Sequence, residues 1–332
     1  MILITGSTGL IGSAASEYYL KKTKRIIGID NNLRKYFFGP KGSNKWKEKK
    51  LIKNKNYFHY NIDLRNKKKI FDLFKKYKFK ITSIIHTAAQ PSHDWAAKEP
   101  ITDFNVNANA TLNLLEAARI FCPNVPFIFT STNKVYGDLE QFDYVEKETR
   151  YEVVGKEQGF DEQCTLDFRS PYGCSKGAAD QYVSDYNRIF NLDTYVIRQS
   201  CIYGPFQYGL EDQGWVSWFL ICSILNKKIS IFGDGKQVRD VLHIDDLVNL
   251  FYKIYINKKK INKRIFNCGG GPKNSLSILE LCKTLNVISK NKMKFQFRKE
   301  RKGDQKIFIS NNLLLKKNFN WKPKVNKFYG IK

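Results

Sequence analysis

A tyrosine and a lysine four positions apart, Tyr172 and Lys176, carry the side chains needed to remove a proton from an alcohol. Residues at this spacing share one face of a helix, with Cβ atoms about 5–6 Å apart. A neighbouring ammonium favours the phenolate, so Lys176 is expected to lower the pKa of Tyr172 toward the range useful for a general base. The spacing also arises by chance in a lysine-rich chain, so on its own it favours a structural role over a catalytic one.

A glycine-rich segment follows the first apolar run and opens a helical pattern; it contains Gly6, Gly9 and Gly12. Glycines at such a place permit a tight turn and the close approach of a diphosphate to a helix N-terminus, where N–H groups and the helix dipole favour anions. The spacing is G-x-x-G-x-x-G and not G-x-G-x-x-G. A bare glycine turn is the alternative, but the position directly after a strand favours nucleotide binding.

Asp30 lies 18 residues after Gly12, at the end of the second predicted strand. An acidic side chain at this place binds both ribose hydroxyls of an adenosine and repels a 2′-phosphate. The predicted cofactor is therefore NAD and not NADP. Arg34 is near enough to neutralise a phosphate, but it is expected to line the adenine side.

The elements that must position these residues alternate between short β-rich runs and amphipathic stretches. Such alternation is typical of βαβ units and predicts six strands of a doubly wound parallel sheet. Segments 108–121 and 177–190 have apolar residues at helical spacing and are predicted crossover helices. Thr132 stands at the end of the fifth strand, and the predicted strands are 2–4, 25–29, 57–60, 83–86, 127–130 and 194–197.

The predicted fold class is α/β, a Rossmann-type doubly wound parallel sheet with a smaller C-terminal substrate-binding lobe. Residues 1–200 are predicted to form the NAD-binding domain, to which the chain returns at about 237–264. After about residue 201 the pattern breaks into Gly- and Pro-rich loops, so residues 201–236 and 265–332 are assigned to a nucleotide-sugar-binding lobe. No linker is long enough to separate two independent domains.

Composition excludes several classes of protein. The 332 residues, 42% of them hydrophobic, can bury a large core, and no run approaches the ~20 apolar residues of a membrane span. The first residues carry no secretory signal, so a cytoplasmic location without a membrane partner is expected. The seven cysteines are scattered, and only four histidines accompany them, so reduced thiols and no metal site are predicted.

The formal charge of +26 invites a nucleic-acid interpretation, because dense basic patches neutralise phosphates. The excess is mostly lysine interleaved with asparagine and isoleucine, as in residues 21–24 and 67–80, and it spreads over the whole chain. No nucleic-acid recognition motif accompanies it. Solvated lysine faces are therefore expected, with no nucleic-acid partner, although the field would attract an anionic substrate.

Taken together, these motifs resemble the extended short-chain dehydrogenase/reductases that modify nucleotide sugars. The resemblance covers almost the whole chain. The segments that carry it include 86–90 (HTAAQ), 105–107 (NVN), 131–137 (STNKVYG), 168–182 (FRSPYGCSKGAADQY), 203–205 (YGP), 212–219 (DQGWVSWF), 235–243 (GKQVRDVLH) and 267–270 (NCGG).

The resemblance implies roles for the matching residues. Thr132 would hydrogen-bond the sugar hydroxyl that is oxidised, Tyr172 would take its proton, and Lys176 would hold the nicotinamide ribose. The residues implied to bind NAD are Gly6, Gly9, Leu10, Ile11, Gly12, Asp30, Asn31, Arg34, Asp63 (at the adenine), Leu64, Ala88, Gln90, Asn107, Tyr172 and Lys176. Those implied to bind the sugar nucleotide are His93, Asn133, Ser200, Cys201, Gln207, Arg239, Arg301 and Asp304.

Two features of the sequence bear on the reaction, a departure from the family pattern and a difference from its dehydratases. Cys201 stands where many relatives have asparagine, which alters the usual amide contact to the substrate. Dehydratases of this family place Asp-Glu after the threonine, because eliminating water needs an additional acid and base. This chain has Asn133 and Lys134 there, so dehydration is disfavoured.

Within the family, the likeness is greatest to epimerases that act at C2 of a CDP-hexose, which implies a role in lipopolysaccharide O-antigen biosynthesis. Nothing in the residues themselves distinguishes C2 from C4. An NAD-dependent epimerase acting at C4, or on a UDP- or GDP-sugar, is the first alternative. A non-catalytic NAD-binding sensor is the second, although the intact Tyr172 and Lys176 argue against it.

A homodimer or homotetramer is expected from the resemblance. Relatives pair the two predicted crossover helices between subunits, and a two-fold contact is the commonest solution. The side chains expected to provide this surface are Ala178, Ala179, Tyr182 and Tyr186.

Overall fold

The computed structural model describes residues 1–257, 259, 261–301 and 303–332, which form two compact units. The first unit contains Met1–Ser131, Ser170–Ile197 and Val248–Phe266. The second contains Thr132–Arg169, Arg198–Leu247 and Asn267–Lys332. The chain therefore passes between the units several times, and Thr132 is the first residue of the second unit.

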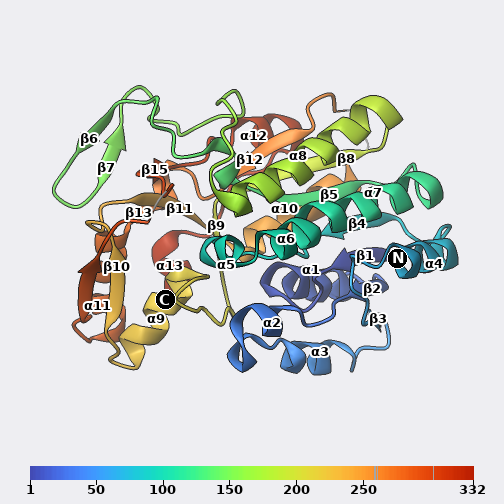
Figure 1. Cartoon of the computed structure of the whole chain (residues 1–332), viewed down its shortest axis with the longest axis horizontal. Helices are drawn as coiled ribbons and strands as arrows, with labels where there is room; N and C mark the ends of the chain where they lie inside the picture. The colour runs from blue at the N-terminus through green and yellow to red at the C-terminus, as the bar shows by residue number, and fades with distance from the viewer. Residues whose placement is uncertain (258, 260, 302) are drawn as a thin grey trace. The chain divides into compact units, whose positions relative to one another are not determined.

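A seven-stranded sheet is the framework of the first unit, with β1 (Ile2–Thr5) between β4 and β2 (Figure 1). The pairs β1–β2, β1–β4, β2–β3 and β4–β5 are parallel. Side chains of β1, β2, β4 and β5 are buried on both faces, as expected for a parallel sheet covered by helices. The order is β12-β8-β5-β4-β1-β2-β3, with β2 Ile26–Ile29, β3 Tyr57–Tyr60, β4 Ser83–His86, β5 Phe127–Thr132, β8 Thr194–Gln199 and β12 Ile265–Cys268.

The predicted fold class is confirmed, but the prediction of six strands was one strand short. The seventh, β12, has one β-branched residue, Ile265, followed by a phenylalanine, an asparagine and a cysteine, so its local strand signal is weak. It lies where the βα alternation has already broken down in the sequence. Its strand character therefore comes from pairing with β8 and not from local propensity.

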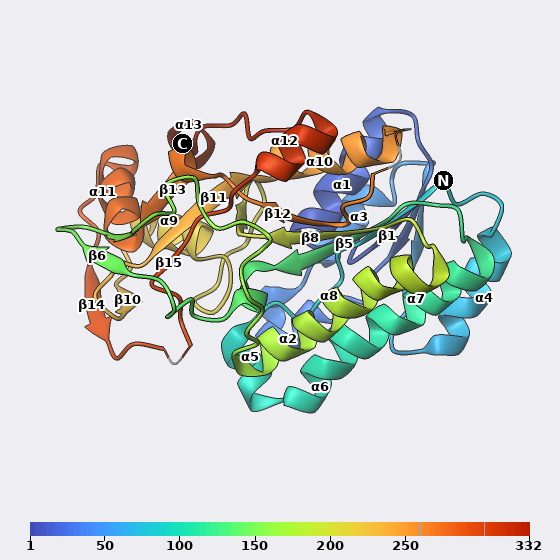
Figure 2. The ribbon, with the colours of Figure 1, turned by 90° about the horizontal axis from the view of Figure 1, so that it is seen from above.

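Helices cover both faces of this sheet. Figure 2 shows α4 (Lys67–Tyr77), α7 (Ala110–Phe121) and α8 (Ser170–Phe190) side by side along one face. On α1 (Leu10–Lys21), Tyr19 packs edge-on against Tyr255 of α10 (Ile244–Ile256). Shorter helices join them: α2 Arg34–Phe38, α3 Lys45–Leu51, α5 His93–Lys98 and α6 Pro100–Phe104.

Helix α8 begins at Ser170, seven residues before the predicted start, so Tyr172 and Lys176 both lie inside it. Pro171 suits a first helical turn, but Gly173 and Gly177 weaken the helical signal in the sequence. A single π-helical turn, Asn105–Asn109, precedes α7, which begins at Ala110 where residue 108 was predicted. Local insertions of this kind often accompany functional sites.

The expectation that Ala179 and Tyr186 lie on the helix surface was wrong. Both belong to the core of the first unit, together with Val183. The positions 179, 183 and 186 follow the helical repeat and form the inward stripe of α8. Tyr182 is exposed as predicted, at 47% of its surface, and Ala178 is partly exposed.

The second unit contains several small sheets. Strand β11 (Val238–His243) pairs with β13 (Ser275–Ser277), β15 (Ile307–Phe308) and β9 (Cys201–Tyr203), and β10 (Ile229–Phe232) pairs with β14 (Phe295–Arg298). A core of apolar side chains lies beneath α9 (Trp215–Ile224) and α11 (Ile278–Ser289). The remaining elements are the hairpin β6 Tyr144–Glu146 and β7 Tyr151–Val153, and the helices α12 Leu313–Phe319 and α13 Lys327–Ile331. Among all the described residues, no helix is both long and apolar enough to cross a membrane.

Candidate active site

The glycine turn joins β1 to α1 in the first unit. Gly6 has φ +62°, and a Cβ on it would press against the backbone of Ala88. A Cβ on Gly12 would overlap the Gly6 carbonyl group. Helix α1 begins at Leu10, and its N-cap residue is Gly9. Because glycine has no side chain to cap the helix, no N-cap side chain covers the N–H groups of the first turn, which includes Leu10 and Ile11. The turn is therefore shaped for a diphosphate at the N-terminus of a twelve-residue helix.

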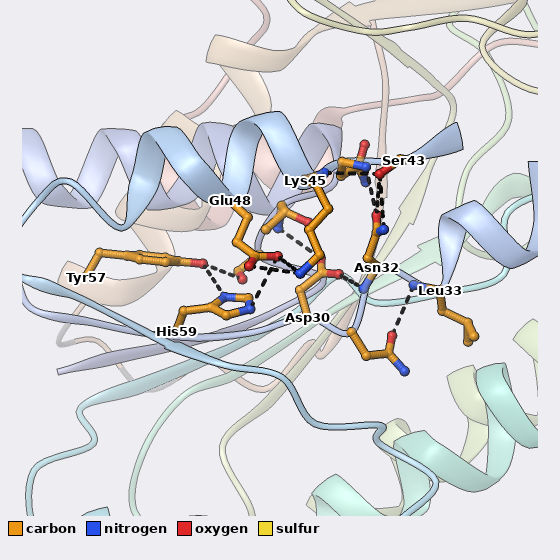
Figure 3. Close-up of polar contacts among 12 residues, drawn as sticks. Asp30, Asn32, Leu33, Ser43, Lys45, Glu48, Tyr57 and His59 are labelled. Atoms are coloured by element: carbon orange, nitrogen blue, oxygen red, sulfur yellow. Dashed lines mark hydrogen bonds and ion pairs between the residues drawn. The ribbon is translucent and has the colours of Figure 1, made fainter. Parts of the chain in front are cut away.

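Asp30 is held against this turn by hydrogen bonds to both of its oxygens (Figure 3). Its Oδ2 accepts from the Thr8 N–H at 3.0 Å and the Thr8 hydroxyl at 2.7 Å, and its Oδ1 accepts from the Asn32 N–H at 2.7 Å. The carboxylate is thus fixed beside the diphosphate cradle. This arrangement fits the adenosine ribose of NAD, and a 2′-phosphate would meet a negative charge.

Arg34 is the first residue of α2, and its guanidinium donates to the Gly42 carbonyl at 3.0 Å. The group also lies over the Phe38 ring, 5.1 Å from its centroid. Burial lowers the pKa of Arg34 from its usual value. The guanidinium is thus held by α2 and by the turn that follows this helix.

A chain of hydrogen-bonded side chains that the sequence analysis missed contacts the glycine turn at Ser7. The Ser7 hydroxyl hydrogen-bonds the Tyr57 hydroxyl at 2.7 Å, and the Tyr57 hydroxyl lies 3.4 Å from Nδ1 of His59 (Figure 3). His59 Nε2 in turn lies 3.6 Å from the Glu48 carboxylate. One signal was available: Gly28 in β2 leaves room for Tyr57, since a Cβ there would overlap the phenol.

Asp63 and Leu64 follow β3, on the same strand end as the predicted adenine site. Asp63 accepts from Arg65 Nε at 2.9 Å, from a terminal Arg65 nitrogen at 2.6 Å and from the Asn31 amide at 3.1 Å. Burial raises the pKa of Asp63, but these hydrogen bonds outweigh it and hold the pKa below its usual value. Leu64 is buried in the sheet core. Asp63 is therefore a carboxylate of fixed orientation that also positions Asn31.

Gln90 and Asn107 form a buried network below the end of β4. The Gln90 N–H donates to Asn107 Oδ1 at 2.9 Å, and the Asn107 amide donates to Asp103 at 2.9 Å and to the Ser175 hydroxyl at 3.0 Å. Burial raises the pKa of Asp103, whose side chain is inaccessible to solvent. Asp103 and Ser175 were missed by sequence reasoning: Asp103 belongs to no recognisable motif, and Ser175 lies within the Tyr172 and Lys176 motif but was given no role. The network ties the π-helical turn to α8 next to Lys176.

Lys176 is almost completely buried, and its ammonium donates to the Thr130 carbonyl at 2.7 Å. Burial lowers the pKa of Lys176 to about 7, against the attraction of Asp180 and Asp103. Asp180 also accepts a hydrogen bond from the Ser131 hydroxyl at 2.6 Å. The lysine is therefore held at the end of β5. Because its pKa is close to neutral pH, a small change in its surroundings changes the fraction of Lys176 that is protonated.

Tyr172 lies one helical turn before Lys176 and is partly exposed. Its ring is 6.4 Å from the ring of His93, the first residue of α5, at an interplanar angle of 56°. The phenol is thus oriented by α8 and flanked by a ring from α5. A partly exposed phenol one turn from a buried ammonium is compatible with general-base catalysis.

Thr132 ends β5 and belongs to the second unit. Its Oγ1 accepts from the Lys134 N–H at 3.2 Å, and its hydroxyl proton makes a long hydrogen bond to Asn133 Oδ1 at 3.4 Å. The next residue, Asn133, donates to Gln305 Oε1 at 3.0 Å, and Gln305 is fully buried. Gln305 is a positioning residue that the sequence analysis missed, because it is 172 positions away along the chain.

Three charged side chains converge in the second unit. Lys134 Nζ and a terminal nitrogen of Arg239 both donate to Oδ1 of Asp304, at 3.1 and 2.8 Å. Burial alone would raise the pKa of Asp304, but the two cations outweigh it and hold the pKa well below its usual range. Arg301 lies 4.0 Å from the Phe232 ring centroid and 3.7 Å from Asp212. Arg239 and Asp304 are thus adjacent, and Lys134 joins them.

The other predicted substrate residues of this unit lie directly before β9, in β9 and in the loop that follows it. Ser200 donates to the Asp240 carbonyl at 2.8 Å, and the Gln207 amide donates to the Ile202 carbonyl at 3.3 Å. Burial raises the pKa of the Cys201 thiol, which therefore stays neutral. In the described part of the chain, no group of three or more His, Cys, Asp or Glu side chains could hold a metal ion.

The predicted residues therefore divide between the units. The first carries the glycine turn, Asp30, the Gln90 network, His93, Tyr172 and Lys176, and the second carries Thr132, Asn133, Ser200, Cys201, Gln207, Arg239, Arg301 and Asp304.

Comparison with known proteins gives a consistent result. Residues 2–269 match the model of the NAD dependent epimerase/dehydratase family. The chain is 42% identical to a CDP-paratose 2-epimerase of Salmonella typhi over 335 residues, which cover 99% of this chain and 96% of that protein.

Solved structures of similar architecture include the UDP-glucose 4-epimerase of Thermotoga maritima with UDP-glucose, with a TM-score of 0.82 and 27% identity, covering 100% of this chain and 96% of that one. Another is the UDP-glucuronic acid 4-epimerase of Bacillus cereus in complex with UDP-glucuronic acid and NAD. It has a TM-score of 0.82 and 26% identity, and the match covers 99% of this chain and 96% of that one.

Proposed function

Because this chain belongs to the NAD dependent epimerase/dehydratase family, we propose that it is an isomerase that inverts C2 of a CDP-hexose, converting CDP-paratose to CDP-tyvelose. The observation that carries the choice of sugar is the 42% identity to a CDP-paratose 2-epimerase over 99% of this chain. Asn133 and Lys134 in place of the Asp-Glu pair of dehydratases also support epimerisation. The same likeness favours a role in lipopolysaccharide O-antigen biosynthesis.

The chemistry of the substrate requires a redox route. A carbon that bears a hydroxyl and has no adjacent carbonyl is too weak an acid for any side chain to deprotonate. Transient oxidation avoids this problem. The hydroxyl loses a proton and the carbon loses a hydride, which gives a ketone. The ketone then presents its other face to the hydride donor and takes back both the hydride and the proton. NAD, when bound, supplies the hydride acceptor and donor, and the cycle consumes no cofactor.

Side chains of this protein perform the proton chemistry. Tyr172 takes the proton from the sugar hydroxyl and returns it after the ketone has turned. Thr132 donates its hydroxyl proton to the sugar oxygen, in exchange for the long hydrogen bond of 3.4 Å that it makes to Asn133 Oδ1, while its own oxygen accepts from the Lys134 N–H. Lys176 hydrogen-bonds the nicotinamide ribose and supplies positive charge near the phenol.

Binding of the two ligands is divided between the parts of the chain. The cofactor residues are the glycine turn, Asp30, Asn31, Arg34, Asp63, Leu64, Ala88, Gln90 and Asn107. Arg239, Arg301 and Asp304 bind the sugar nucleotide, because guanidinium groups suit phosphate oxygens and a carboxylate suits ribose hydroxyls. His93, Asn133, Ser200, Cys201 and Gln207 complete the sugar site.

A two-fold assembly through α7 and α8 completes the proposal. Both helices carry exposed apolar side chains, among them Ile120, Tyr182, Ile189 and Phe190. Such a face favours association of identical subunits. Light scattering at micromolar concentration is expected to give the mass of a dimer or tetramer, and a monomeric mass would contradict it.

The decisive test of the activity is the product formed from CDP-paratose. We expect the purified protein to contain NAD, released on denaturation and identified by mass spectrometry, and to give a C2-inverted product by NMR. UDP- and GDP-hexoses serve as competing substrates. Turnover confined to a UDP-hexose, or inversion at C4, would instead support the related 4-epimerase activity. Bound NADP in place of NAD would contradict the role of Asp30.

A further inference from the structure

We propose that Lys134 binds the sugar-linked phosphate of the substrate when C2 lies at Thr132. This inference rests on the proposed function, since it explains how a nucleotide sugar would be placed with C2 and not C4 at the reacting position. Neither the glycine turn nor the Tyr172 and Lys176 pair distinguishes these two carbons. The evidence comes from side chains of the second unit alone.

Lys134 is joined to Thr132 through the backbone. The two residues are separated by one position, at the start of the 3-10 helix η3 (Asn133–Tyr136). The Lys134 N–H donates to Thr132 Oγ1 at 3.2 Å, and the Lys134 ammonium extends to Asp304. A single residue therefore both orients the threonine hydroxyl and carries a cation within one side-chain length of it.

The surroundings of Lys134 contain more positive than negative charge. Lys134 and Arg239 share one oxygen of Asp304, at 3.1 and 2.8 Å, so this triad has two cations for one carboxylate. Their side chains are only 20%, 11% and 28% exposed, in the order Lys134, Arg239, Asp304. Solvent therefore screens the excess charge weakly, and an anion that enters gains more than it would at the surface. Burial lowers the pKa of Lys134, and Asp304 opposes that effect.

The connectivity of a nucleotide sugar determines where its phosphate must lie. The diphosphate is attached at C1, and C2 is the carbon bonded directly to C1, whereas C4 is on the opposite side of the ring. When a C2 hydroxyl binds Thr132, the sugar-linked phosphate therefore lies close to Thr132. When a C4 hydroxyl binds there, the phosphate points away. A cation attached two residues after the threonine suits the first arrangement.

The proposal distinguishes the two phosphates of the nucleotide, and binding experiments use this. Isothermal titration of the NAD-loaded protein with CDP and with CMP compares ligands that differ only in the outer phosphate. Lys134→Met is expected to weaken CDP binding by about tenfold or more, as for loss of a charge-assisted hydrogen bond, and to leave CMP binding within about twofold. Lys134→Arg keeps the charge and should restore most of the CDP affinity.

Lys147→Met is the matched control, because Lys147 is a half-exposed lysine of the same unit that lies 3.9 Å from Glu152. It lowers the net charge equally and should leave both affinities unchanged. With CDP-paratose, Lys134→Met should raise KM about tenfold, and Lys134→Arg should return it toward the wild-type value. If Lys134→Met weakened the binding of CDP and of CMP equally, Lys134 would only support Asp304. If CDP binding were unchanged, Lys134 would not contact the phosphate. Either result overturns the proposal.

Failure of the proposed function gives a different result. A wild-type protein that does not act on CDP-paratose but binds UDP or GDP would refute CDP-paratose as the substrate. The role of Lys134 would then be tested in the same way, by comparing the binding of UDP with UMP, or of GDP with GMP. A wild-type protein that binds no nucleoside diphosphate more tightly than its monophosphate would overturn the proposal for Lys134.

Discussion

The Lys176 ammonium donates a hydrogen bond to the Thr130 carbonyl at 2.7 Å, inside a part of the first unit that excludes solvent. A buried lysine is costly, because its charge loses hydration that one carbonyl and two nearby carboxylates replace only in part. This cost of burial lowers the pKa of Lys176 to about 7. A residue so unfavourable for folding is expected to be retained for its chemistry.

The cost should be visible as a pH-dependent instability. The folded pKa of Lys176 is about 7 and the ordinary value is 10.5, so between these pH values the unfolded chain binds the additional proton. Stability therefore rises with pH across this window, and the full penalty is present below pH 7. Lys176→Met should make the cofactor-free protein more stable at pH 7 by at least about 2 kcal/mol, with the difference shrinking toward pH 10.

Urea unfolding at pH 7 and pH 9.5 measures this difference, with Lys147→Met as the control for loss of one positive charge. A Lys176→Met variant that is no more stable than the wild type at pH 7 would contradict the burial argument.

Replacing Tyr172 by Phe should reduce turnover by about 10²- to 10⁴-fold, the usual effect of removing a general base. The ring would remain to pack near His93, so NAD content and melting temperature should change little. Tyr182→Phe is the control, since Tyr182 lies on the same helix and is exposed. Steady-state kinetics and the NAD content of each purified variant provide the measurement. A Tyr172→Phe enzyme that keeps more than a tenth of wild-type turnover would exclude Tyr172 as the base.

Arg239→Ala should raise KM strongly and also lower kcat, because binding energy from the diphosphate positions the sugar for reaction. A charge-assisted contact is worth roughly 1.5–3 kcal/mol, so an effect of tenfold or more on kcat/KM is expected. Arg239→Lys should recover only part of it, since an ammonium lacks the planar fork. The NAD content should not change. Kinetics within about twofold of wild type would show that Arg239 only neutralises Asp304.

Much of the fold and part of the site could be predicted from the sequence, because the signals are local. The segments 57–60 and 83–86 are strands with the predicted bounds, since short apolar runs between turn residues determine their own conformation. The glycine turn and the position of Asp30 after β2 follow from backbone freedom and chain order. The shared helix of Tyr172 and Lys176 follows from their spacing.

Other features were determined only by the tertiary structure. Strand β12 forms through its pairing with β8. The packing of α8 on the sheet decides that Ala179, Val183 and Tyr186 are the residues of this helix that face the core. Asp304 meets Lys134 across 170 positions of the chain. Gln305 meets Asn133 across 172.

The physical reason for this division is the range of the forces involved. Turn geometry and side-chain periodicity depend on neighbours a few residues away. The sequence by itself therefore determined the cofactor turn, the parallel sheet that is typical of βαβ units and the position of phenol and ammonium on one helix. Burial and ion pairing depend on which distant segments meet. Only the tertiary structure therefore decided that Lys176 lies in a dry environment with a pKa near neutrality, and that Lys134 joins Arg239 on a single carboxylate.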